Sequence, residues 1–295
     1  MSGIDALFIT PRSRLEVYQG LSNDYAAIEP PVWSSLIANY LKERKYNVAI
    51  LDAEAENLTH EETAEKILKL NPKLAVFMIY GQQPSASTQC MPGGNKTCKK
   101  LNDLSSNEIK SIVVGTHASA LPRQTLDEEP YTYVCQGEGP LTIKNLIDYI
   151  NGKIKDIKKI PGLWYFSEDN TLSFNPSAKM FEDLDNELPG QAWKLLDMKK
   201  YRAHNWHSFG RLDTRDLYAS LQTSLGCPFK CTFCCINAPF ERNTIRFWSP
   251  KHVANQVKIL VEEYNIFNIK IPDEMFVLNP KQVIGICDEI IKLGY

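Results

Sequence analysis

The sequence predicts an α/β protein with a parallel sheet over residues 1–150. Short apolar runs alternate there with stretches whose apolar residues recur at helical spacing, which is typical of strands joined by crossover helices. The length of 295 residues allows about two domains. A cysteine-rich loop follows a further strand-like run late in the chain. We therefore expect a second α/β part after the first sheet.

Five apolar runs have the character of buried parallel strands. They are residues 6–10, 47–51, 74–80, 109–114 and 133–135. A helix is expected after Pro30 and Pro31, and another over 59–70, where Thr59 and Glu62 form a capping box. A third is expected over 141–150, whereas the helix before the fourth strand is poorly marked. Cys90 and Cys98 are interpreted as isolated thiols that flank a Pro-Gly-Gly loop.

Small and polar residues follow four of these strands. Ligands of parallel α/β sheets bind beyond the carboxyl ends of the strands, so these loops are candidate sites, although each alone also suits an ordinary tight turn. The residues are Thr10, Ser85, Ser87, Gly115, Thr116, His117, Gly137, Glu138 and Gly139. A dinucleotide site is disfavoured because no Gly-x-Gly-x-x-Gly follows the first strand.

Residues 151–215 are predicted to be a linker. Two strand-like runs, 161–166 and 171–174, flank a Glu-Asp-Asn turn and predict a β-hairpin. The later run 201–207 is rich in aromatic and histidine residues. We interpret it as a linker with surface aromatics rather than as a pocket wall.

Residues 216–295 alternate strand and helix again. Strands are predicted over 217–223 and 268–271, and helices over 280–293 and after Ser249-Pro250, where serine caps the helix and proline takes its first position. Two βα units are therefore expected.

The loop after the first of these strands carries three cysteines, Cys227, Cys231 and Cys234, at spacing C-x3-C-x2-C. Gly226 and Pro228 prevent a regular element there. Three thiolates on one loop suit zinc or an iron–sulfur cluster. A structural zinc site usually adds a second ligand pair, which is missing here. A disulfide framework is disfavoured in a chain of this size.

With the aromatic Phe233 before its last cysteine, this motif resembles the signature of radical S-adenosylmethionine (SAM) enzymes. The resemblance implies that Cys227, Cys231 and Cys234 hold three irons of a [4Fe–4S] cluster. It also implies that the open fourth iron is chelated by the amino and carboxylate groups of SAM, near Phe233. An electron from the cluster would then cleave SAM to a 5′-deoxyadenosyl radical.

The loops of the first sheet extend the resemblance to the cobalamin-binding subclass of that family. Gly115-x-His117-Ala-x-x-x-Pro122 and Gly137-Glu-Gly139 are similar to motifs of this subclass. The resemblance implies a Rossmann-like B12-binding domain over 1–150, with cobalamin at the nine loop residues named above, and a partial (β/α) barrel that starts at 216. The sequence has no Asp-x-His-x-x-Gly, so no histidine of that motif ligates cobalt. His117 is expected to be a hydrogen-bonding residue.

The resemblance also places SAM contacts at the end of the second barrel strand. Asp273 and Glu274 lie there, and their carboxylates suit the ammonium group of SAM. Arg242 and Arg246 are expected to meet a carboxylate of SAM or of the substrate.

The expected function is cobalamin-dependent radical SAM methyl transfer to an unactivated carbon of a small molecule, with an electron donor such as flavodoxin or ferredoxin. The alternatives are a cyclisation or rearrangement with the same cofactors, or a non-catalytic iron–sulfur or zinc module. The barrel appears truncated after two βα units, so the chain by itself is expected to be catalytically incompetent.

The composition of the chain argues against a nucleic-acid-binding, membrane-spanning or secreted protein. Lys and Arg (33) nearly balance Asp and Glu (35), which favours neither nucleic acid nor an acidic membrane as a partner. No apolar run approaches the roughly 20 residues of a membrane span, and the N-terminus does not resemble a signal peptide. Eight cysteines without such a signal predict a reducing cytoplasm.

Overall fold

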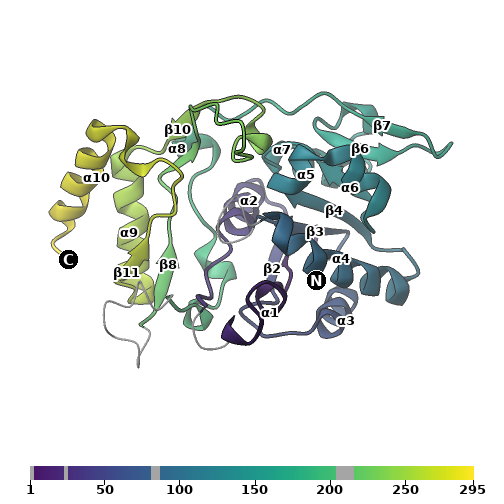
Figure 1. Cartoon of the computed structure of the whole chain (residues 1–295), viewed down its shortest axis with the longest axis horizontal. Coiled ribbons are helices and arrows are strands. Elements are labelled where there is room, and N and C mark those ends of the chain that lie inside the picture. Colours follow the sequence, from purple (N-terminus) through teal and green to yellow (C-terminus); the bar gives the residue numbers. More distant parts are fainter. Residues whose placement is uncertain (1–2, 23–25, 81–86, 204–215) are drawn as a thin grey trace.

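The computed structural model describes residues 3–22, 26–80, 87–203 and 216–295. Its largest element is a seven-stranded sheet in the order β2-β1-β3-β4-β5-β6-β7 (Figure 1). The strands are β1 Ala6–Thr10, β2 Val48–Asp52, β3 Leu74–Ile79, β4 Lys110–Gly115, β5 Tyr133–Cys135, β6 Leu163–Phe166 and β7 Leu172–Phe174. Strands β1 to β5 pair in parallel, as the sequence predicts. The α/β class is confirmed.

Helices cover both faces of the parallel part of this sheet, and its central strands are buried on both sides. In β1, Phe8 belongs to the core on one face and Leu7 and Ile9 to the core on the other, as strand alternation requires. The helices are α1 Arg14–Tyr18, α2 Val32–Glu43, α3 His60–Leu70, α4 Ser87–Ser105, α5 Thr116–Ala120, α6 Pro122–Glu128 and α7 Pro140–Ile150. The predicted capping box of α3 is present.

Two local predictions in this part need correction. The Pro-Gly-Gly segment between Cys90 and Cys98 is not a loop but lies inside α4. Glycine is needed there for close packing, since a Cβ on Gly93 would lie 2.1 Å from the carbonyl oxygen of Arg12. The predicted hairpin exists as β6 and β7, but it does not stand apart, because β6 pairs antiparallel with β5 and extends the sheet.

The C-terminal part contains one parallel βαβ unit and a small antiparallel hairpin, at the opposite end of the molecule from β7 (Figure 1). Its strands are β8 Tyr218–Ser220, β9 Ser224–Gly226, β10 Ile245–Phe247 and β11 Asn268–Lys270. Its helices are α9 Pro250–Tyr264 and α10 Pro280–Leu293, and the linker adds α8 Leu184–Glu187. Short 3₁₀ turns lie at Gln19–Ser22, Ile157–Lys159, Trp193–Leu195, Met198–Lys200, Ala238–Phe240 and Phe276–Leu278.

The prediction of one strand over 217–223 is wrong. Strand β8 pairs with β11, and β9 pairs with β10, so the chain changes sheets between them. The break occurs where the N–H of Thr223 donates to Asp273 at 2.8 Å and its carbonyl accepts from Trp248 at 3.1 Å. The N–H of Thr223 is thus taken by a side chain, and its carbonyl already bonds to the residue that follows β10 rather than to β11.

Polar contacts join the C-terminal part to the first sheet. The Nζ of Lys270 in β11 lies 2.7 Å from Glu29, which also accepts from Ser220 of β8 at 3.1 Å. Arg202 forms antiparallel bridges with Ile28 and Leu217. The two parts are therefore packed together rather than merely tethered.

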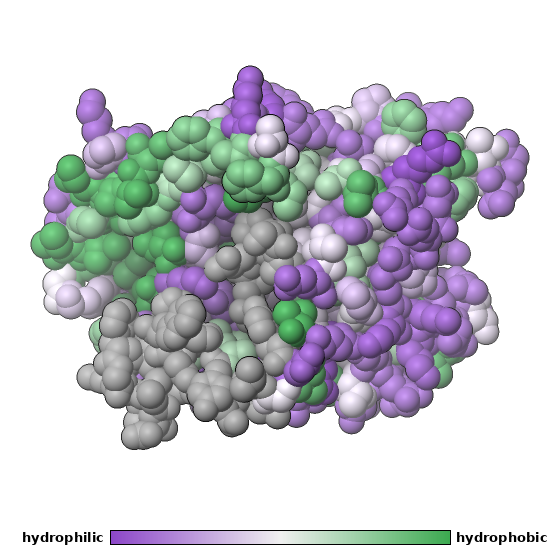
Figure 2. Space-filling model, viewed as in Figure 1, coloured by the Kyte–Doolittle hydropathy of each residue, from purple (hydrophilic) through white to green (hydrophobic). Residues whose placement is uncertain are grey.

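Hydrophobic residues gather on the surface over the C-terminal helices (Figure 2). The exposed ones include Phe267, Val277, Ile284, Ile291 and Tyr295. Among the described residues, no helix is both long and apolar enough to cross a membrane.

Candidate cofactor site

A cavity of about 130 Å³ opens at the carboxyl ends of β1, β2 and β3. Strand β1 lies between β2 and β3, so the chain order reverses direction here, and such switch points are where open α/β sheets bind ligands. Thr10, Asp52 and Tyr80 line the cavity from the sheet, and Gln222 and Pro272 line it from the C-terminal part. The cavity therefore lies between the two parts of the chain.

Asp52 contributes a buried carboxyl to this cavity and is 5% exposed. One oxygen accepts from the N–H groups of Glu54 and Ala55, both at 3.1 Å, and the other accepts from the hydroxyl of Tyr201 at 3.1 Å. Burial raises the pKa of Asp52 to about 7, and these hydrogen bonds offset only part of that rise. Asp52 is therefore a group that titrates near neutral pH.

We expect Asp52 to make the folded state less stable as the pH rises. With its pKa raised in the folded state, the group holds its proton from about pH 4 to about pH 7, where the unfolded chain has released it. The free energy of unfolding therefore falls across this window, by a few kcal/mol. Urea unfolding at about pH 5 and pH 8 is expected to show a smaller decline for Asp52→Asn than for the wild type. Equal declines would contradict the assignment.

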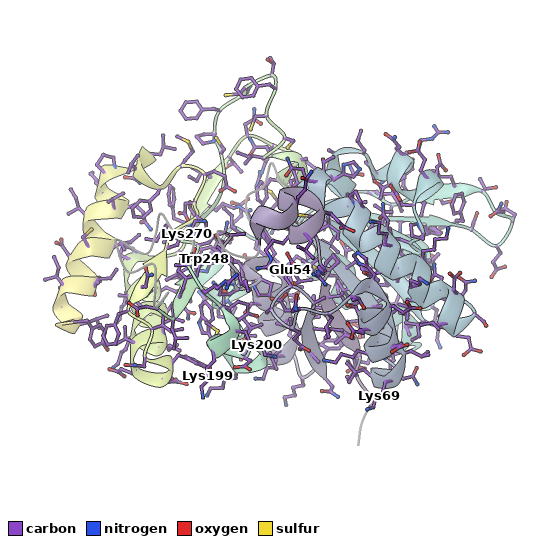
Figure 3. The ribbon with its side chains drawn as sticks, turned by 60° about the horizontal axis from the view of Figure 1, so that its bottom comes forward. Glu54, Lys69, Lys199, Lys200, Trp248 and Lys270 are labelled. Atoms are coloured by element: carbon purple, nitrogen blue, oxygen red, sulfur yellow. The ribbon has the colours of Figure 1, made fainter. Side chains whose placement is uncertain are left out.

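Arg14 and Glu54 place unpaired polar atoms at the same cavity. Arg14 is 7% exposed, and its Nε and Nη1 atoms have no hydrogen-bond partner within the described part of the chain. One oxygen of Glu54 accepts from the Arg14 backbone N–H at 2.8 Å, and the other has no partner in the same part. Figure 3 shows Glu54 near the middle of the molecule. Buried polar groups are nearly always satisfied, and a bound group with both donors and acceptors would satisfy these atoms.

A second set of predicted residues comes together at the ends of β3 and β4. The hydroxyl of Ser87 donates to the carbonyl of Ile79 and accepts from the His117 N–H at 3.1 Å. The Nδ1 of His117 lies 3.0 Å from the Thr88 hydroxyl, and burial lowers the pKa of this histidine. Thr116 is buried beside them. Ser85 lies outside the described residues.

Gly115 ends β4 where the backbone of β3 approaches closely. A Cβ at this position would lie 2.1 Å from the carbonyl oxygen of Ile79. We therefore expect Gly115→Ala to destabilise the chain by about 3 kcal/mol, at the upper end of the cost of overpacking. Urea unfolding at fixed pH measures this cost. Gly3→Ala is a suitable comparison, since nothing lies within 4 Å of a Cβ at that position and its φ is not left-handed. Equal stability of Gly115→Ala and the wild type would refute the steric argument.

That the Gly137-Glu138-Gly139 loop contacts cobalamin stays a prediction, and the structure adds an ion pair at its central residue. Glu138 is 7% exposed and forms a buried ion pair with Arg246 of β10. Glu138 is not among the residues that line the cavity at β1 to β3, and its carboxylate occupies the Nη1 and Nη2 atoms of Arg246. Arg242 pairs with Glu182 at the surface. Sequence reasoning missed both ion pairs because each joins residues distant in the chain.

The cysteine loop leaves the β9–β10 hairpin immediately after Gly226. Cys227 is buried at the base, whereas Cys231, Cys234 and Phe233 are exposed. The structure does not bring the three thiols together as a metal-binding group within the residues it describes. Their chemistry nevertheless suits an iron–sulfur cluster, because three thiols share one accessible loop.

Asn237 closes this loop, and sequence reasoning missed it. Its amide oxygen accepts from the Cys227 N–H at 3.0 Å, and its nitrogen donates to the Cys227 carbonyl at 2.8 Å. The same nitrogen lies within hydrogen-bond distance of Phe229 and Asn243. The base of the loop is therefore fixed by hydrogen bonds, and Cys231 and Cys234 at its tip are exposed.

The two carboxylates predicted to bind SAM have different surroundings. Asp273 accepts hydrogen bonds from the Thr223 N–H at 2.8 Å and from the hydroxyls of Thr223 and Ser224, both at 2.6 Å. Glu274 is half-buried, and its Oε2 has no partner among the described residues. Burial raises the pKa of Glu274 to about 7. Asp273 therefore already accepts three hydrogen bonds, whereas Oε2 of Glu274 accepts none among the described residues, and both stay predicted SAM contacts.

Comparisons with known proteins show what the parallel sheet and the whole chain are similar to. The family model described as "B12 binding domain" matches residues 19–147. An uncharacterized methyltransferase of Pyrococcus horikoshii is 30% identical over 266 residues, which cover 90% of this chain and 53% of that protein. The anaerobic magnesium-protoporphyrin IX monomethyl ester cyclase of Rubrivivax gelatinosus is 26% identical over 290 residues, 97% of this chain and 48% of that protein. The chain spans about half the length of the curated relatives it matches.

Solved structures share the fold over almost the whole chain. The cobalamin-dependent SAM radical enzyme OxsB with aqua-cobalamin bound has a TM-score of 0.70 at 17% identity, covering 98% of this chain and 37% of that one. The radical SAM methyltransferase TsrM of Kitasatospora setae, with cobalamin and a [4Fe–4S] cluster bound, has a TM-score of 0.67 at 18% identity. That match covers 99% of this chain and 51% of TsrM.

Proposed function

We propose that this chain is a cobalamin-binding radical SAM enzyme and takes part in methyl transfer to an unactivated carbon of a small molecule. The observation that carries the proposal is the cavity at the β1–β3 switch point, where Arg14 and Glu54 leave polar atoms unpaired. It lies at the carboxyl edge of the B12-binding fold and faces the part that carries the cysteine loop. When bound, the cluster supplies the electron that cleaves SAM, and the corrinoid carries the methyl group.

Arg14 and Glu54 suit the primary amides on the rim of a corrin ring. The unpaired N–H groups of Arg14 are donors for an amide oxygen, and the unpaired oxygen of Glu54 is an acceptor for an amide NH₂. A neutral group that offers both would satisfy the two residues at once. A simple anion would satisfy Arg14 but would be repelled by an ionised Glu54.

The remaining roles follow from the positions of the other residues. Cys227, Cys231 and Cys234 would hold the cluster, and the unpaired oxygen of Glu274 would accept from the SAM ammonium group. The exposed tip of the cysteine loop would be accessible to an electron donor such as flavodoxin or ferredoxin. Oxygen-sensitive thiols of this kind suit a reducing cytoplasm.

We expect Glu274→Gln and Asp273→Asn to have separate effects. Glu274→Gln should weaken SAM binding by about tenfold, since a hydrogen bond between charged groups contributes about 1.5 kcal/mol or more. Asp273→Asn should instead lower the free energy of unfolding, because Thr223 and Ser224 lose a charged acceptor. Calorimetric titration of the cluster-loaded chain with SAM at about pH 8, where Glu274 is ionised, and urea unfolding measure the two effects. The assignment would be wrong if Asp273→Asn weakened SAM binding more than Glu274→Gln did.

A second outcome, ring closure with the same cofactors, is favoured by the similarity to the Rubrivivax gelatinosus cyclase. Methyl transfer and ring closure both need the cluster and the corrinoid. The first test therefore asks whether the chain binds both cofactors. We would reconstitute the chain anaerobically with iron, sulfide and hydroxocobalamin, remove free cofactor, and record the absorption spectrum. Corrinoid and cluster bands together support the proposal. A cluster without corrinoid, or bound zinc alone, would refute methyl transfer by this route.

A further inference from the structure

The buried ion pair between Glu138 and Arg246 joins the edge of the sheet to the hairpin that carries the cysteine loop. Their side chains are 7% and 4% exposed, and both terminal nitrogens of Arg246, Nη1 and Nη2, contact the carboxylate, with Nη1 at 3.2 Å. Glu138 follows β5, whereas Arg246 lies 108 residues further along the chain. The ion pair is thus a direct link between the two parts of the chain.

Hydrogen bonds and tight turns at the edge of the sheet hold Glu138 in place. Gly137 and Gly139 have φ angles of +122° and +105°, so Glu138 lies in a tight bend that favours glycine on both sides. The Gly137 N–H donates to the Ser119 hydroxyl at 3.1 Å, and this hydroxyl lies 3.4 Å from the Gly137 carbonyl. Ser119 belongs to α5, which starts directly after β4. Glu138 is therefore fixed relative to the ends of β4 and β5.

The β9–β10 hairpin places Arg246 close to Cys227, the first cysteine of the loop. Arg246 is paired with Leu225 across the hairpin, and Gly226 is paired with Ile245, so Cys227 is the next residue after the last pair. Arg246 also donates to the Phe181 carbonyl at 2.6 Å. A displacement of the Arg246 side chain would therefore move the strand that begins the cysteine loop.

A set of aromatic contacts supports the same hairpin. The guanidinium of Arg246 lies 5.2 Å from the ring centre of Phe240. Phe240 lies 6.2 Å from Trp33, which stacks on Tyr80 at 4.5 Å, at the end of β3. Aromatic contacts tolerate some sliding, whereas two parallel hydrogen bonds between guanidinium and carboxylate fix distance and orientation. The ion pair therefore supplies the directional part of this interface.

We propose that Glu138 and Arg246 are positioning residues, which hold the cysteine loop at one place relative to the carboxyl edge of the sheet. The inference rests on the proposed function, in which that loop holds a cluster and that edge holds a corrinoid. The ion pair then sets a single separation between the two cofactors. As positioning residues, Glu138 and Arg246 are assigned no chemical step.

The separation is measured by pulsed electron paramagnetic resonance on the chain loaded with both cofactors and reduced, since the reduced cluster and cob(II)alamin are both paramagnetic. The wild type is expected to give one narrow distance distribution. Glu138→Gln, which keeps the shape but removes the charge, is expected to give a broader or shifted one. Glu182→Gln is the matched control, because it breaks the exposed ion pair with Arg242 in the same region. It is expected to leave the wild-type distribution unchanged.

Arg246→Lys keeps the positive charge but loses the two parallel hydrogen bonds, so it tests the inference should Glu138→Gln fail to fold. It too is expected to broaden the distribution. A wild-type distribution in a loaded Glu138→Gln or Arg246→Lys chain would overturn the inference and leave the proposed function intact. A wild type that binds no corrinoid would overturn both.

Discussion

Cys231→Ala is expected to remove nearly all bound iron from the anaerobically reconstituted chain, whereas Cys235→Ala should retain it. Both thiols are exposed on the same loop, so general reactivity does not distinguish them. Cys231 belongs to the C-x3-C-x2-C set, and Cys235 adjoins Cys234, where its thiol would strain to reach the same metal. A cluster that loses one of its three thiolate ligands becomes open to solvent and loses iron.

Iron and sulfide analysis, with the absorption spectrum of each variant, measures this difference. Because both residues are exposed, neither substitution is expected to change the free energy of unfolding of the metal-free chain by more than about 0.5 kcal/mol. Equal iron content in the two variants would show that the motif is not the ligand set.

Arg14→Met is expected to weaken hydroxocobalamin binding by about tenfold to a hundredfold. A hydrogen bond to a charged group contributes roughly 1.5–3 kcal/mol, and Arg14 is the buried cation at the cavity whose N–H groups lack partners in the described chain. Methionine fills most of the same volume, so the cavity wall is preserved. Spectroscopic titration of the chain with hydroxocobalamin gives the affinity.

Arg44→Met is the matched control for this experiment. Arg44 lies at the exposed end of α2, where it donates to the Tyr40 carbonyl at 2.9 Å, away from the cavity. Its loss removes the same charge from the chain without touching the site. Equal affinities of the two variants would place the corrinoid elsewhere.

Most of the sheet is predictable from the sequence because its strands are short apolar runs buried on both faces. The runs at β1, β3 and β5 stand out without knowledge of their neighbours, and the capping box of α3 is a local signal. The carboxyl edge of the sheet is equally predictable, so Thr10, Ser87 and His117 are found where the loops require them.

What the sequence does not predict depends on contacts between distant residues. The break between β8 and β9 is set by Asp273, 50 residues from Thr223, so the run 217–223 reads as one strand. Pro92, Gly93 and Gly94 lie in a helix that packs closely on Arg12, and this distant contact is not visible in the local sequence. Arg14 and Glu54 escaped notice because their significance lies in unpaired atoms at a cavity, which no local pattern reveals.

The contact between Glu29 and Lys270 has a consequence for how the chain folds. It joins residues 241 positions apart, and it connects β8 and β11 to the start of the first sheet. During synthesis, Glu29 emerges from the ribosome long before its partner. The first sheet can pair its own strands in that interval, but the interface must wait for β11. We therefore expect two kinetic phases in refolding, with the slower one reporting the closure of this long loop.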